Sequence, residues 1–358
     1  MIRFLDLKAA HEPIRQELHD AVSRVVASGW FVLGPEVEAF ENEWAAFVGA
    51  QHCISVGNGL DALTLTLRAC GVEPGDEVLV PSHTFVATWL AVAACGAVPV
   101  PVEVDPATFN LTAEAISSAI GPRTRAVLPV HLYGQPFDSQ RLAAAAGDVL
   151  VVEDAAQAHG ARWNGTRVGG AGNAACWSFY PSKNLGALGD GGAVTTDDPE
   201  LAAQLRLLRN YGSRQKYVHE QAGVNSRLDE MHAAALRVQL QHLDRFNERR
   251  REIARRYTEG LAGVVTTPFV AAEAEHVWHL YVIRSDGRDR LADRLRASGV
   301  ETLIHYPTPC HQQPAFSRGE SLPIAETMAA TVLSLPMGPH LTDEDVERVI
   351  GLVVDLAP

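Results

Sequence analysis

The chain has 358 residues, of which 47% are apolar and 20% charged, and its formal net charge at pH 7 is -13. This length allows two domains that share an interface, and the apolar content is sufficient for a large core. The acidic balance, without a basic tail or stripe, argues against binding of nucleic acid or of a membrane surface. An anionic substrate must therefore be held by local hydrogen-bond donors.

The cysteines are odd in number, widely spaced and mostly set in apolar runs: Cys53, Cys70, Cys95, Cys176 and Cys310. This pattern favours reduced thiols in the cytoplasm over a disulfide framework, a metal site or an iron–sulfur cluster. No signal peptide is apparent, and no apolar run reaches the ~18 residues needed to span a bilayer. We therefore expect a soluble, cytoplasmic protein without a metal site.

Two amphipathic helices are predicted first, from His11 to Ser28 and from Pro35 onward. Short β-rich runs then alternate with helical segments over roughly 130 residues, which indicates a mostly parallel sheet with helices on both faces. Ligands in such sheets gather beyond the carboxyl ends of the strands. The predicted strands are Cys53–Val56, Glu77–Val80, Val98–Val102, Ala126–Val130, Val149–Val152 and Cys176–Phe179.

A long helical stretch without internal proline runs from Asp229 to about Leu261 and leads into a carboxyl-terminal part. We expect that part to form a compact α+β unit of about 100 residues. We place the large domain at 1–245, including the N-terminal helices, and the small domain at 246–358. The predicted elements of the carboxyl-terminal part are strands at Val277–Ile283 and Glu301–His305 and helices at Arg288–Ala297, Ile324–Leu333 and Asp343–Leu356.

Lys183 and Asp154 follow two successive predicted strands and lie 29 positions apart. An amine and a carboxylate so placed can hold opposite ends of a flat heteroaromatic ring such as pyridoxal 5'-phosphate (PLP). The lysine binds the aldehyde as a Schiff base, and the acid keeps the ring nitrogen protonated, so that the ring stabilises a carbanion. Taken singly, either residue also fits an ordinary role, as a surface lysine or as a helix-capping aspartate.

Polar residues near Asp154 extend this pattern, since Gln157 and His159 could hydrogen-bond the ring oxygen or the aspartate. Phe85 follows a predicted strand end and could stack on a planar cofactor, whereas Trp89 is expected in the core.

The turn Gly57-Asn58-Gly59 precedes a predicted helix at Leu60–Ala69. Amides at a helix N-terminus can hold a phosphate, although Asn-Gly is also a common turn dipeptide. The chain contains neither G-x-G-x-x-G nor G-x-x-x-x-G-K-[ST], so a dinucleotide-binding Rossmann site or a nucleoside triphosphate P-loop is unsupported.

Five motifs occur in this order along the chain: Gly57-Asn58-Gly59-Leu60-Asp61-Ala62-Leu63, Pro81-Ser82-His83-Thr84-Phe85, Glu153-Asp154-Ala155-Ala156-Gln157-Ala158-His159-Gly160, Ser178-Phe179-Tyr180-Pro181-Ser182-Lys183-Asn184-Leu185 and Gly223-Val224-Asn225-Ser226-Arg227-Leu228. Together they resemble the DegT/DnrJ/EryC1/StrS family of PLP-dependent nucleotide-sugar aminotransferases. The resemblance extends over essentially the whole chain. It implies an aspartate-aminotransferase-like α/β large domain (PLP fold type I), a small α+β carboxyl-terminal domain, and a homodimer with active sites at its interface.

The resemblance also implies roles for individual residues. Lys183 is the catalytic residue that forms the Schiff base, and Asp154 is the partner of the pyridine nitrogen. Gln157 lies beside the ring, and Phe85 stacks on its face. The residues implied to hold the phosphate are Gly57, Asn58, Gly59 and Ser178, with Asn225 from the other subunit; Tyr217 and His305 are candidates for contacting the sugar nucleotide.

Relatives that dehydrate sugars carry histidine where this chain has Lys183, so the resemblance implies transamination. An amino group would pass from L-glutamate to a nucleotide-linked keto sugar, with pyridoxamine 5'-phosphate as the intermediate cofactor form. The segments Gly29–Pro35, Asn58-Gly59 and Leu303–Pro307 are most similar to the branch that acts on C3 of dTDP-3-keto-6-deoxyhexoses.

Several alternatives stay open. Within the family they are a C4 aminotransferase and an aminotransferase acting on a UDP-linked keto sugar. A non-catalytic regulator that keeps the fold is an alternative of another class. A PLP enzyme outside sugar metabolism, such as an amino-acid decarboxylase, has less support, because no arginine stands out for an amino-acid carboxylate apart from the candidate Arg227.

Overall fold

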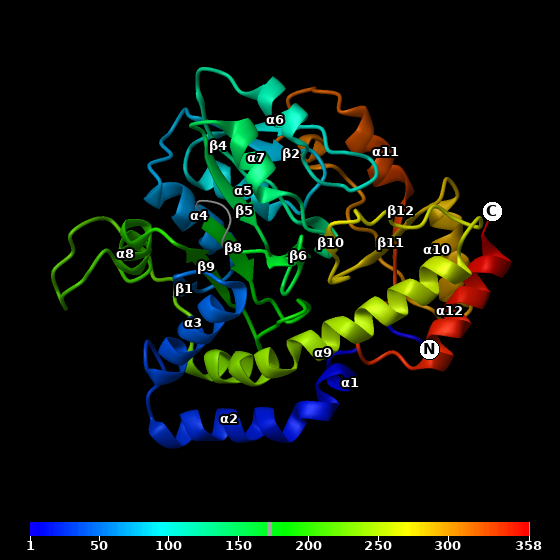
Figure 1. Ribbon diagram of the computed structural model, residues 1–358, viewed down its shortest axis with the longest axis horizontal. Helices are drawn as coiled ribbons and strands as arrows, with labels where there is room; N and C mark the ends of the chain where they lie inside the picture. The colour runs from blue at the N-terminus through cyan, green and yellow to red at the C-terminus, as the bar shows by residue number, and fades with distance from the viewer. Residues whose placement is uncertain (170–173, 358) are drawn as a thin grey trace.

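The computed structural model describes residues 1–169 and 174–357. A seven-stranded sheet lies at its centre, in the order β1-β9-β8-β5-β4-β2-β3 (Figure 1). Strand β9 pairs antiparallel with both β1 and β8, and all other neighbours pair in parallel. The mostly parallel α/β sheet predicted from the sequence is confirmed. Its strands are β1 (His52–Val56), β2 (Glu77–Pro81), β3 (Val98–Val102), β4 (Thr124–Val127), β5 (Leu150–Asp154), β8 (Ala174–Ser178) and β9 (Gly192–Thr196).

Helices cover both faces of the sheet because successive strand side chains point to opposite sides. In β2, Val78 and Val80 belong to one apolar cluster, whereas Leu79 between them belongs to another. The first face packs against α4 (Gly59–Ala69), α5 (Ala87–Ala94) and α8 (Pro199–Leu208); the second packs against α3 (Pro35–Val48), α6 (Ala113–Ala119) and α7 (Ser139–Ala146).

Local sequence fixes the bounds of α3. Pro35 occupies its first turn, where a missing amide hydrogen costs nothing, and Gly49 ends it with a φ of 85°. Its start is capped by the buried carboxylate of Glu230, which accepts hydrogen bonds from the amides of Gly34 at 2.6 Å and Glu36 at 2.8 Å. This carboxylate therefore ties the N-terminus of α3 to the first residue of the next long helix.

That helix, α9 (Glu230–Gly260), passes from the sheet to the carboxyl-terminal part, and α2 (Arg15–Ser28) lies beside it (Figure 1). The carboxyl-terminal part has its own apolar core, which includes Tyr257 and Tyr281. The predicted domain boundary after residue 245 falls within α9, and the division into 1–245 and 246–358 stays a prediction. This part contains β11 (Tyr281–Arg284), β12 (Val332–Leu335), α10 (Arg288–Ala297), α11 (Pro323–Thr331) and α12 (Asp343–Leu356).

Two predictions in this part are wrong. Glu301–His305 is not a strand; it makes only an isolated bridge between Leu303 and Ser334. The partner of β11 is instead β12, whose first residues lie within the predicted helix Ile324–Leu333. A mostly apolar run of four buried residues is compatible with either a helix or a strand. Here the run forms a strand because it pairs antiparallel with β11.

Shorter elements complete the chain, and the N-terminus returns to the carboxyl-terminal part, where the Ile2 amide donates to the Gly299 carbonyl at 2.8 Å. Among the described residues, no helix is both long and apolar enough to cross a membrane. The shorter elements are α1 (Leu7–His11), η1 (Glu12–Ile14), η2 (Leu132–Gly134), η3 (Cys310–Gln312), β6 (Arg162–Trp163), β7 (Thr166–Arg167) and β10 (Ala274–Glu275).

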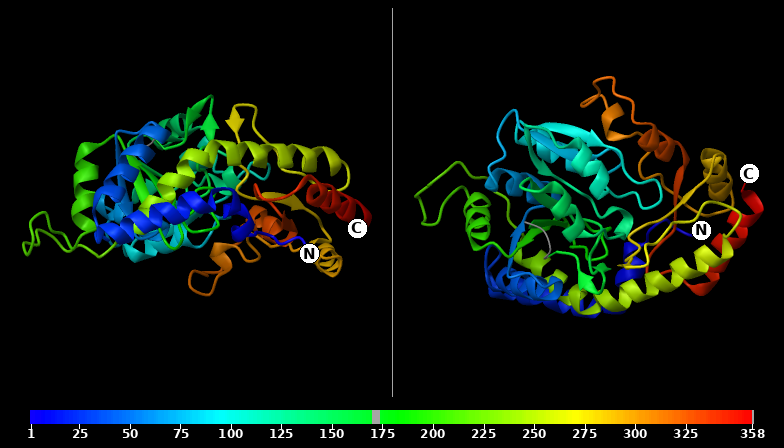
Figure 2. Two further views of the ribbon diagram at one scale, coloured as in Figure 1. Left: turned by 90° about the horizontal axis from the view of Figure 1, so that it is seen from below. Right: turned by 45° about the horizontal axis from the view of Figure 1, so that its top comes forward.

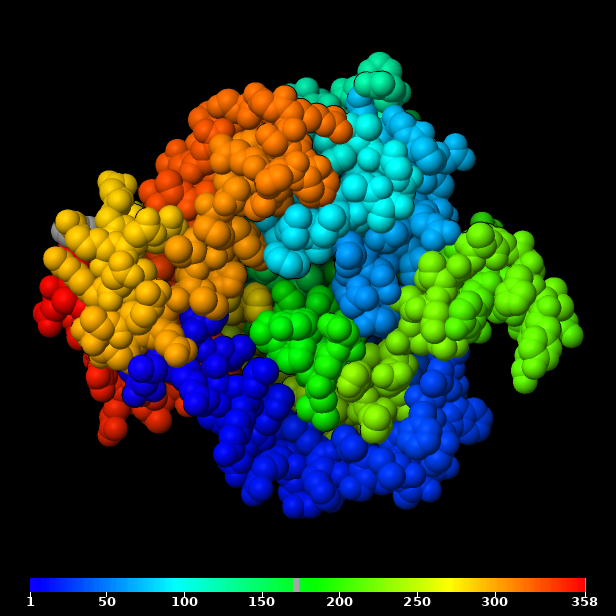
Figure 3. All heavy atoms as spheres, turned by 180° about the vertical axis from the view of Figure 1, so that it is seen from behind, coloured from blue at the N-terminus to red at the C-terminus, as the bar shows by residue number. Residues whose placement is uncertain are grey.

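The middle of the segment 209–228, between α8 and α9, projects from the body of the molecule (Figure 2). Seen from behind, it forms a lobe at one side, and the surface is hollowed where the segments following β2 and β8 approach the carboxyl-terminal part (Figure 3).

Candidate active site

A cavity of about 480 Å³ lies beyond the carboxyl ends of β5 and β8. It forms where parallel strands end and the carboxyl-terminal part closes over them, the usual place for a ligand in such sheets. Eight of the residues implied by the resemblance line it: Asn58, Gly59, Phe85, Asp154, Gln157, Ser178, Lys183 and His305.

Lys183 lies in the loop after β8, where its backbone amide donates to the Tyr180 carbonyl at 2.8 Å. Its side chain is half-buried and its amine is enclosed by the cavity walls. Enclosure disfavours the charged form and lowers the pKa of Lys183 to about 8, although the negative charge of Asp154 acts in the opposite direction. Roughly a tenth of this amine is therefore neutral and nucleophilic at pH 7, far more than for an ordinary lysine.

Asp154 ends β5 and is buried. Its Oδ2 accepts a hydrogen bond from Thr88 Oγ1 at 2.9 Å, and its Oδ1 accepts one from the Ala156 amide at 3.2 Å. Burial raises the pKa of this carboxyl, while the two hydrogen bonds and the Lys183 charge oppose the rise. Because burial has the largest effect on this carboxyl, its ionised form is stabilised by a cationic donor, such as the N–H of a protonated pyridine ring.

The N-terminus of α4 provides donors for an anion. Asn58 caps the helix by accepting the Asp61 amide on Oδ1 at 2.8 Å. Within the described part of the chain, the amides of Gly59 and Leu60 make no hydrogen bond, as expected of the first residues of a helix. A Cβ at Gly59 would lie 2.7 Å from Ser178 Cβ, so only glycine brings this amide beside the serine. The arrangement fits a phosphate.

Gly57 is placed differently from the other residues implied to hold phosphate. Its amide donates to Ser226 Oγ at 2.9 Å, and that hydroxyl donates in turn to Asp61 Oδ2 at 2.6 Å. The Gly57 amide is therefore engaged in holding the turn against the segment before α9.

Phe85 and Tyr306 supply flat surfaces in the cavity, with ring centroids 5.7 Å apart. Gln157 is fixed at both ends: its Nε2 donates to the Tyr306 hydroxyl at 3.1 Å, and its Oε1 accepts the Tyr133 amide at 2.6 Å. Phe85 is 52% exposed, so its ring is available to a bound molecule. Trp89, in contrast, is buried, as expected for a core residue.

His159 lies behind the cavity rather than on its wall. Its ring packs near those of Trp44, Trp177 and Phe179, and neither nitrogen has a hydrogen-bond partner within the described residues. Burial lowers the pKa of His159 to about 3, so the imidazole is neutral.

Asn225 and Tyr217 are not brought to the cavity of their own chain. Both belong to the segment 209–228, where Asn225 is exposed and forms a bridge with Asn210. Tyr217 is 83% exposed. The 480 Å³ cavity is thus built without them.

Sequence reasoning missed several residues of the cavity and its support. Thr88 lies four residues after Thr84 in the sequence, a spacing that could have suggested a second polar group near the strand end. Tyr133 is distant in sequence, and its hydroxyl donates to the His305 carbonyl, while His83 Nε2 lies 2.8 Å from the same hydroxyl. Further cavity residues to which the sequence alone assigns no role include Tyr180, Ser182, His279 and Tyr306.

The residues present fit PLP: an enclosed amine of lowered pKa, a buried carboxylate, free helix amides beside a serine, and aromatic walls. On a mostly parallel sheet, this combination defines a PLP-dependent enzyme of the aspartate-aminotransferase type. The chain belongs to the DegT/DnrJ/EryC1/StrS aminotransferase family, whose model matches residues 12–354. It is a transaminase, and pyridoxal phosphate is its cofactor.

Curated relatives match the chain over nearly its full length. The chain is 53% identical to a dTDP-3-amino-3,4,6-trideoxy-alpha-D-glucose transaminase from Streptomyces venezuelae, covering 99% of this chain and 96% of that protein. It is 50% identical to a dTDP-3-amino-3,6-dideoxy-alpha-D-galactopyranose transaminase from Aneurinibacillus thermoaerophilus, covering 99% of each.

Solved structures agree with this assignment. The crystal structure of S. venezuelae DesV in complex with a ketimine intermediate superposes with a TM-score of 0.97 at 53% identity, covering 99% of this chain and 98% of that one. NtdA from Bacillus subtilis, with bound cofactor PMP, has a TM-score of 0.90 at 31% identity, covering 99% and 84%.

Proposed function

We propose that this enzyme moves an amino group from L-glutamate to C3 of a dTDP-linked 3-keto-6-deoxyhexose. The observation that carries the proposal is the full-length similarity, at 50% identity or above, to transaminases named for dTDP-3-amino sugars from two organisms. The cavity supports it, because Lys183 and Asp154 face a space large enough for both a cofactor ring and a sugar.

Lys183 is the group that moves protons in this proposal. When bound, the cofactor supplies an electron sink for the electron pair left at the carbon that loses a proton. With a pKa near 8, Nζ of Lys183 can take a proton from the amino donor's α-carbon and release it again, which suits a general acid/base. Asp154 holds a positive charge at the ring nitrogen, and Thr88 keeps that carboxylate oriented.

The assay is direct. The purified holoenzyme is incubated with L-glutamate and, separately, a dTDP-3-keto, a dTDP-4-keto and a UDP-3-keto sugar, and the products are identified by mass spectrometry. We expect an amino sugar from the dTDP-3-keto substrate and none with Lys183→Ala. Product formed only from the 4-keto sugar would contradict the assignment to C3.

A UDP-linked keto sugar is the second candidate. The chain is 44% identical to a UDP-N-acetyl-3-dehydro-alpha-D-glucosamine 3-aminotransferase from Acidithiobacillus ferrooxidans, which favours C3 on either nucleotide. The same assay compares the two substrates by their kcat/KM values.

A regulator that keeps the fold is the candidate of another class. Relatives named "Erythromycin biosynthesis sensory transduction protein EryC1" and "Pleiotropic regulatory protein" are 54% and 44% identical to this chain. Sustained turnover of glutamate with any of the three keto sugars would exclude a purely regulatory role.

We further propose a homodimer with shared active sites. An exposed apolar face supports it: Trp30, Phe31 and Val32 are 58%, 47% and 41% exposed, and the Phe31 carbonyl accepts the Glu230 amide beside the exposed Met231. Such patches mark protein interfaces. A second subunit would bring Asn225 and Tyr217 within reach of a cavity that their own chain builds without them.

Complementation tests the sharing of sites. Lys183→Ala and Asn225→Ala chains are purified separately, mixed under conditions that exchange subunits, and assayed. A mixed dimer has one site with both residues intact, so activity should return if Asn225 acts across the interface. No recovery despite proven exchange would contradict that role.

We also infer a cytoplasmic location, in keeping with five free cysteines.

A further inference from the structure

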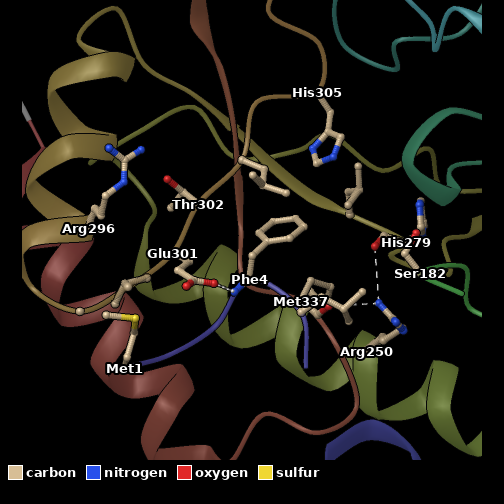
Figure 4. Close-up of a pocket in the computed structure, with 15 residues that line it drawn as sticks. Met1, Phe4, Ser182, Arg250, His279, Arg296, Glu301, Thr302, His305 and Met337 are labelled. Atoms are coloured by element: carbon tan, nitrogen blue, oxygen red, sulfur yellow. Dashed lines mark hydrogen bonds between the residues drawn. The ribbon is translucent and has the colours of Figure 1, made fainter. Parts of the chain in front are cut away.

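A second cavity, of about 710 Å³, adjoins the first (Figure 4). It lies between the N-terminal segment, α9 and the carboxyl-terminal part. Four residues line both cavities: Ser182, His279, Leu280 and His305. Ser182 directly precedes Lys183, so the shared wall stands next to the reactive amine.

Arg250, on α9, lines this second cavity and is 5% exposed. Its Nη1 donates to the carbonyl oxygens of Trp278 at 3.0 Å and of His279 and Met337 at 3.5 Å. Nε and Nη2 make no hydrogen bond within the described residues, and neither atom is fully enclosed by protein. Arg250 thus offers two charged donors to the cavity.

No acid side chain among the described residues pairs with Arg250. Its neighbour in sequence, Arg249, is bound to Glu252 and Asp343 at 2.7 Å each, as is usual for an arginine. Burial alone lowers the pKa of Arg250, to about 10. A buried guanidinium without a counter-ion is costly, and an anionic ligand would compensate it.

Arg250 lies at one end of the second cavity (Figure 4). Figure 4 shows it at the same end as Ser182 and His279, with Phe4 and Met337 between it and Arg296. Arg296 bonds to Asp293 at 3.2 Å, and Glu301, the one acid among the described residues that line the cavity, accepts the Phe4 amide at 3.1 Å. The unpaired cation is therefore at the end nearest Lys183.

The charges of Lys183 and Arg250 both act on His279, which lines both cavities. Burial lowers its pKa well below the usual value, and the charges of Lys183 and Arg250 lower it further. Its imidazole is therefore neutral, and it lies near enough to Lys183 and Arg250 for both charges to lower its pKa. His279 lines both cavities, so a ligand at the wall they share would lie beside a residue on which both charges act.

We propose that Arg250 binds a carboxylate of the amino-acid donor and of the 2-oxo acid formed from it, so that the second cavity is the donor's carboxylate subsite. This rests on the proposed function in its choice of donor. Arg227, the candidate for such a role in the sequence, lines neither cavity, and its Nη1 donates to Asn210 Oδ1 at 3.0 Å.

The two half-reactions of the holoenzyme separate this role from general damage. Arg250→Lys and Arg250→Gln are compared with Arg288→Lys, a matched control, because Arg288 is also buried and its Nη1 donates to two carbonyl oxygens, of Ala329 and Val332. The first half-reaction, with L-glutamate, is followed by release of 2-oxoglutarate. The second starts from enzyme loaded with pyridoxamine 5'-phosphate and uses the keto sugar.

We expect both Arg250 variants to lower kcat/KM for L-glutamate in the first half-reaction by about 10- to 100-fold, the loss typical of a charged hydrogen bond. The kcat/KM for the keto sugar in the second half-reaction should stay within about threefold of the wild-type value. Arg288→Lys should change neither. Equal losses in both half-reactions, or a loss with the sugar alone, would contradict the assignment.

A binding measurement adds a readout that does not depend on turnover. Glutarate has the two carboxylates of the donor but no amine, and calorimetric titration should show that it binds the wild-type holoenzyme and binds Arg250→Lys at least about tenfold more weakly. Wild-type enzyme that fails to bind glutarate would contradict the subsite. Failure of glutamate as donor, with glutarate binding intact, would instead count against the proposed donor alone.

Discussion

Thr88 Oγ1 donates a hydrogen bond of 2.9 Å to Asp154 Oδ2, and both side chains are buried. A donor aimed at the ionised carboxyl lowers its pKa against the effect of burial. This contact links helix α5 to the end of β5, and it holds the carboxylate in the form that can pair with a protonated ring.

Thr88→Val keeps the shape of the side chain and removes the donor. We expect cofactor affinity to fall about tenfold, since a hydrogen bond to a charged group is worth ~1.5 kcal/mol or more. Equilibrium dialysis against pyridoxal phosphate measures this. Thr88→Ser, which keeps the hydroxyl, should bind almost as the wild type does, and an equally weakened serine variant would point to packing instead.

Cofactor capture by the cofactor-free protein should depend on pH through Lys183. Only the neutral amine attacks the aldehyde, so the rate should rise with pH and level off above about 8, the pKa of Lys183. Asp154 raises that pKa by its charge, so Asp154→Asn should move the plateau to lower pH. Stopped-flow absorbance records the profile; a shift to higher pH would contradict the coupling.

Gly192→Ala should destabilise the fold. A Cβ at Gly192 would lie 2.4 Å from both the carbonyl carbon and the oxygen of Asn58, which are backbone atoms that cannot turn aside. We expect the free energy of unfolding to fall by about 1–3 kcal/mol, measured by chemical denaturation. Gly351→Ala is the matched control: nothing lies within 4 Å of its Cβ, and alanine in a helix should stabilise by about 0.5–1 kcal/mol.

Glu230→Gln tests the junction of α3 and α9. The carboxylate accepts three amides, from Gly34, Glu36 and Val37, and a neutral amide has only one oxygen with which to replace them. We expect a loss of about 1–3 kcal/mol in the free energy of unfolding. Glu73→Gln, at an exposed position, should stay within about 0.5 kcal/mol. Similar values for the two variants would show that the cap is unimportant.

Much of the fold could be predicted because local patterns and tertiary pairing agree. Strand β5 is an apolar run ending in Asp154, and α10 and α12 have the predicted bounds. The strand β12 could not be predicted, because Val332–Leu335 becomes a strand only by pairing with β11. The pattern of a short apolar run does not show whether it will pair with a strand distant in the sequence.

The candidate site divides in the same way. Lys183 and Asp154 could be found because the first follows a strand and the second ends one, and strand ends meet at one edge of a parallel sheet. Tyr133 and Arg250 could not, since one reaches the site through the His305 carbonyl and the other from the middle of a long helix. Roles assigned by resemblance to Asn225 and Tyr217 depend on a second subunit and stay proposals.

The measurement that tests the central claim most directly is borohydride trapping of the cofactor, followed by peptide mass mapping. The chain has only three lysines, Lys8, Lys183 and Lys216, so the attachment site can be read without ambiguity. Reduction should fix a phosphopyridoxyl group on the peptide that contains Lys183, and on no peptide of Lys183→Ala. Attachment at Lys8 or Lys216, or an unmodified Lys183 peptide in the reduced holoenzyme, would contradict the account.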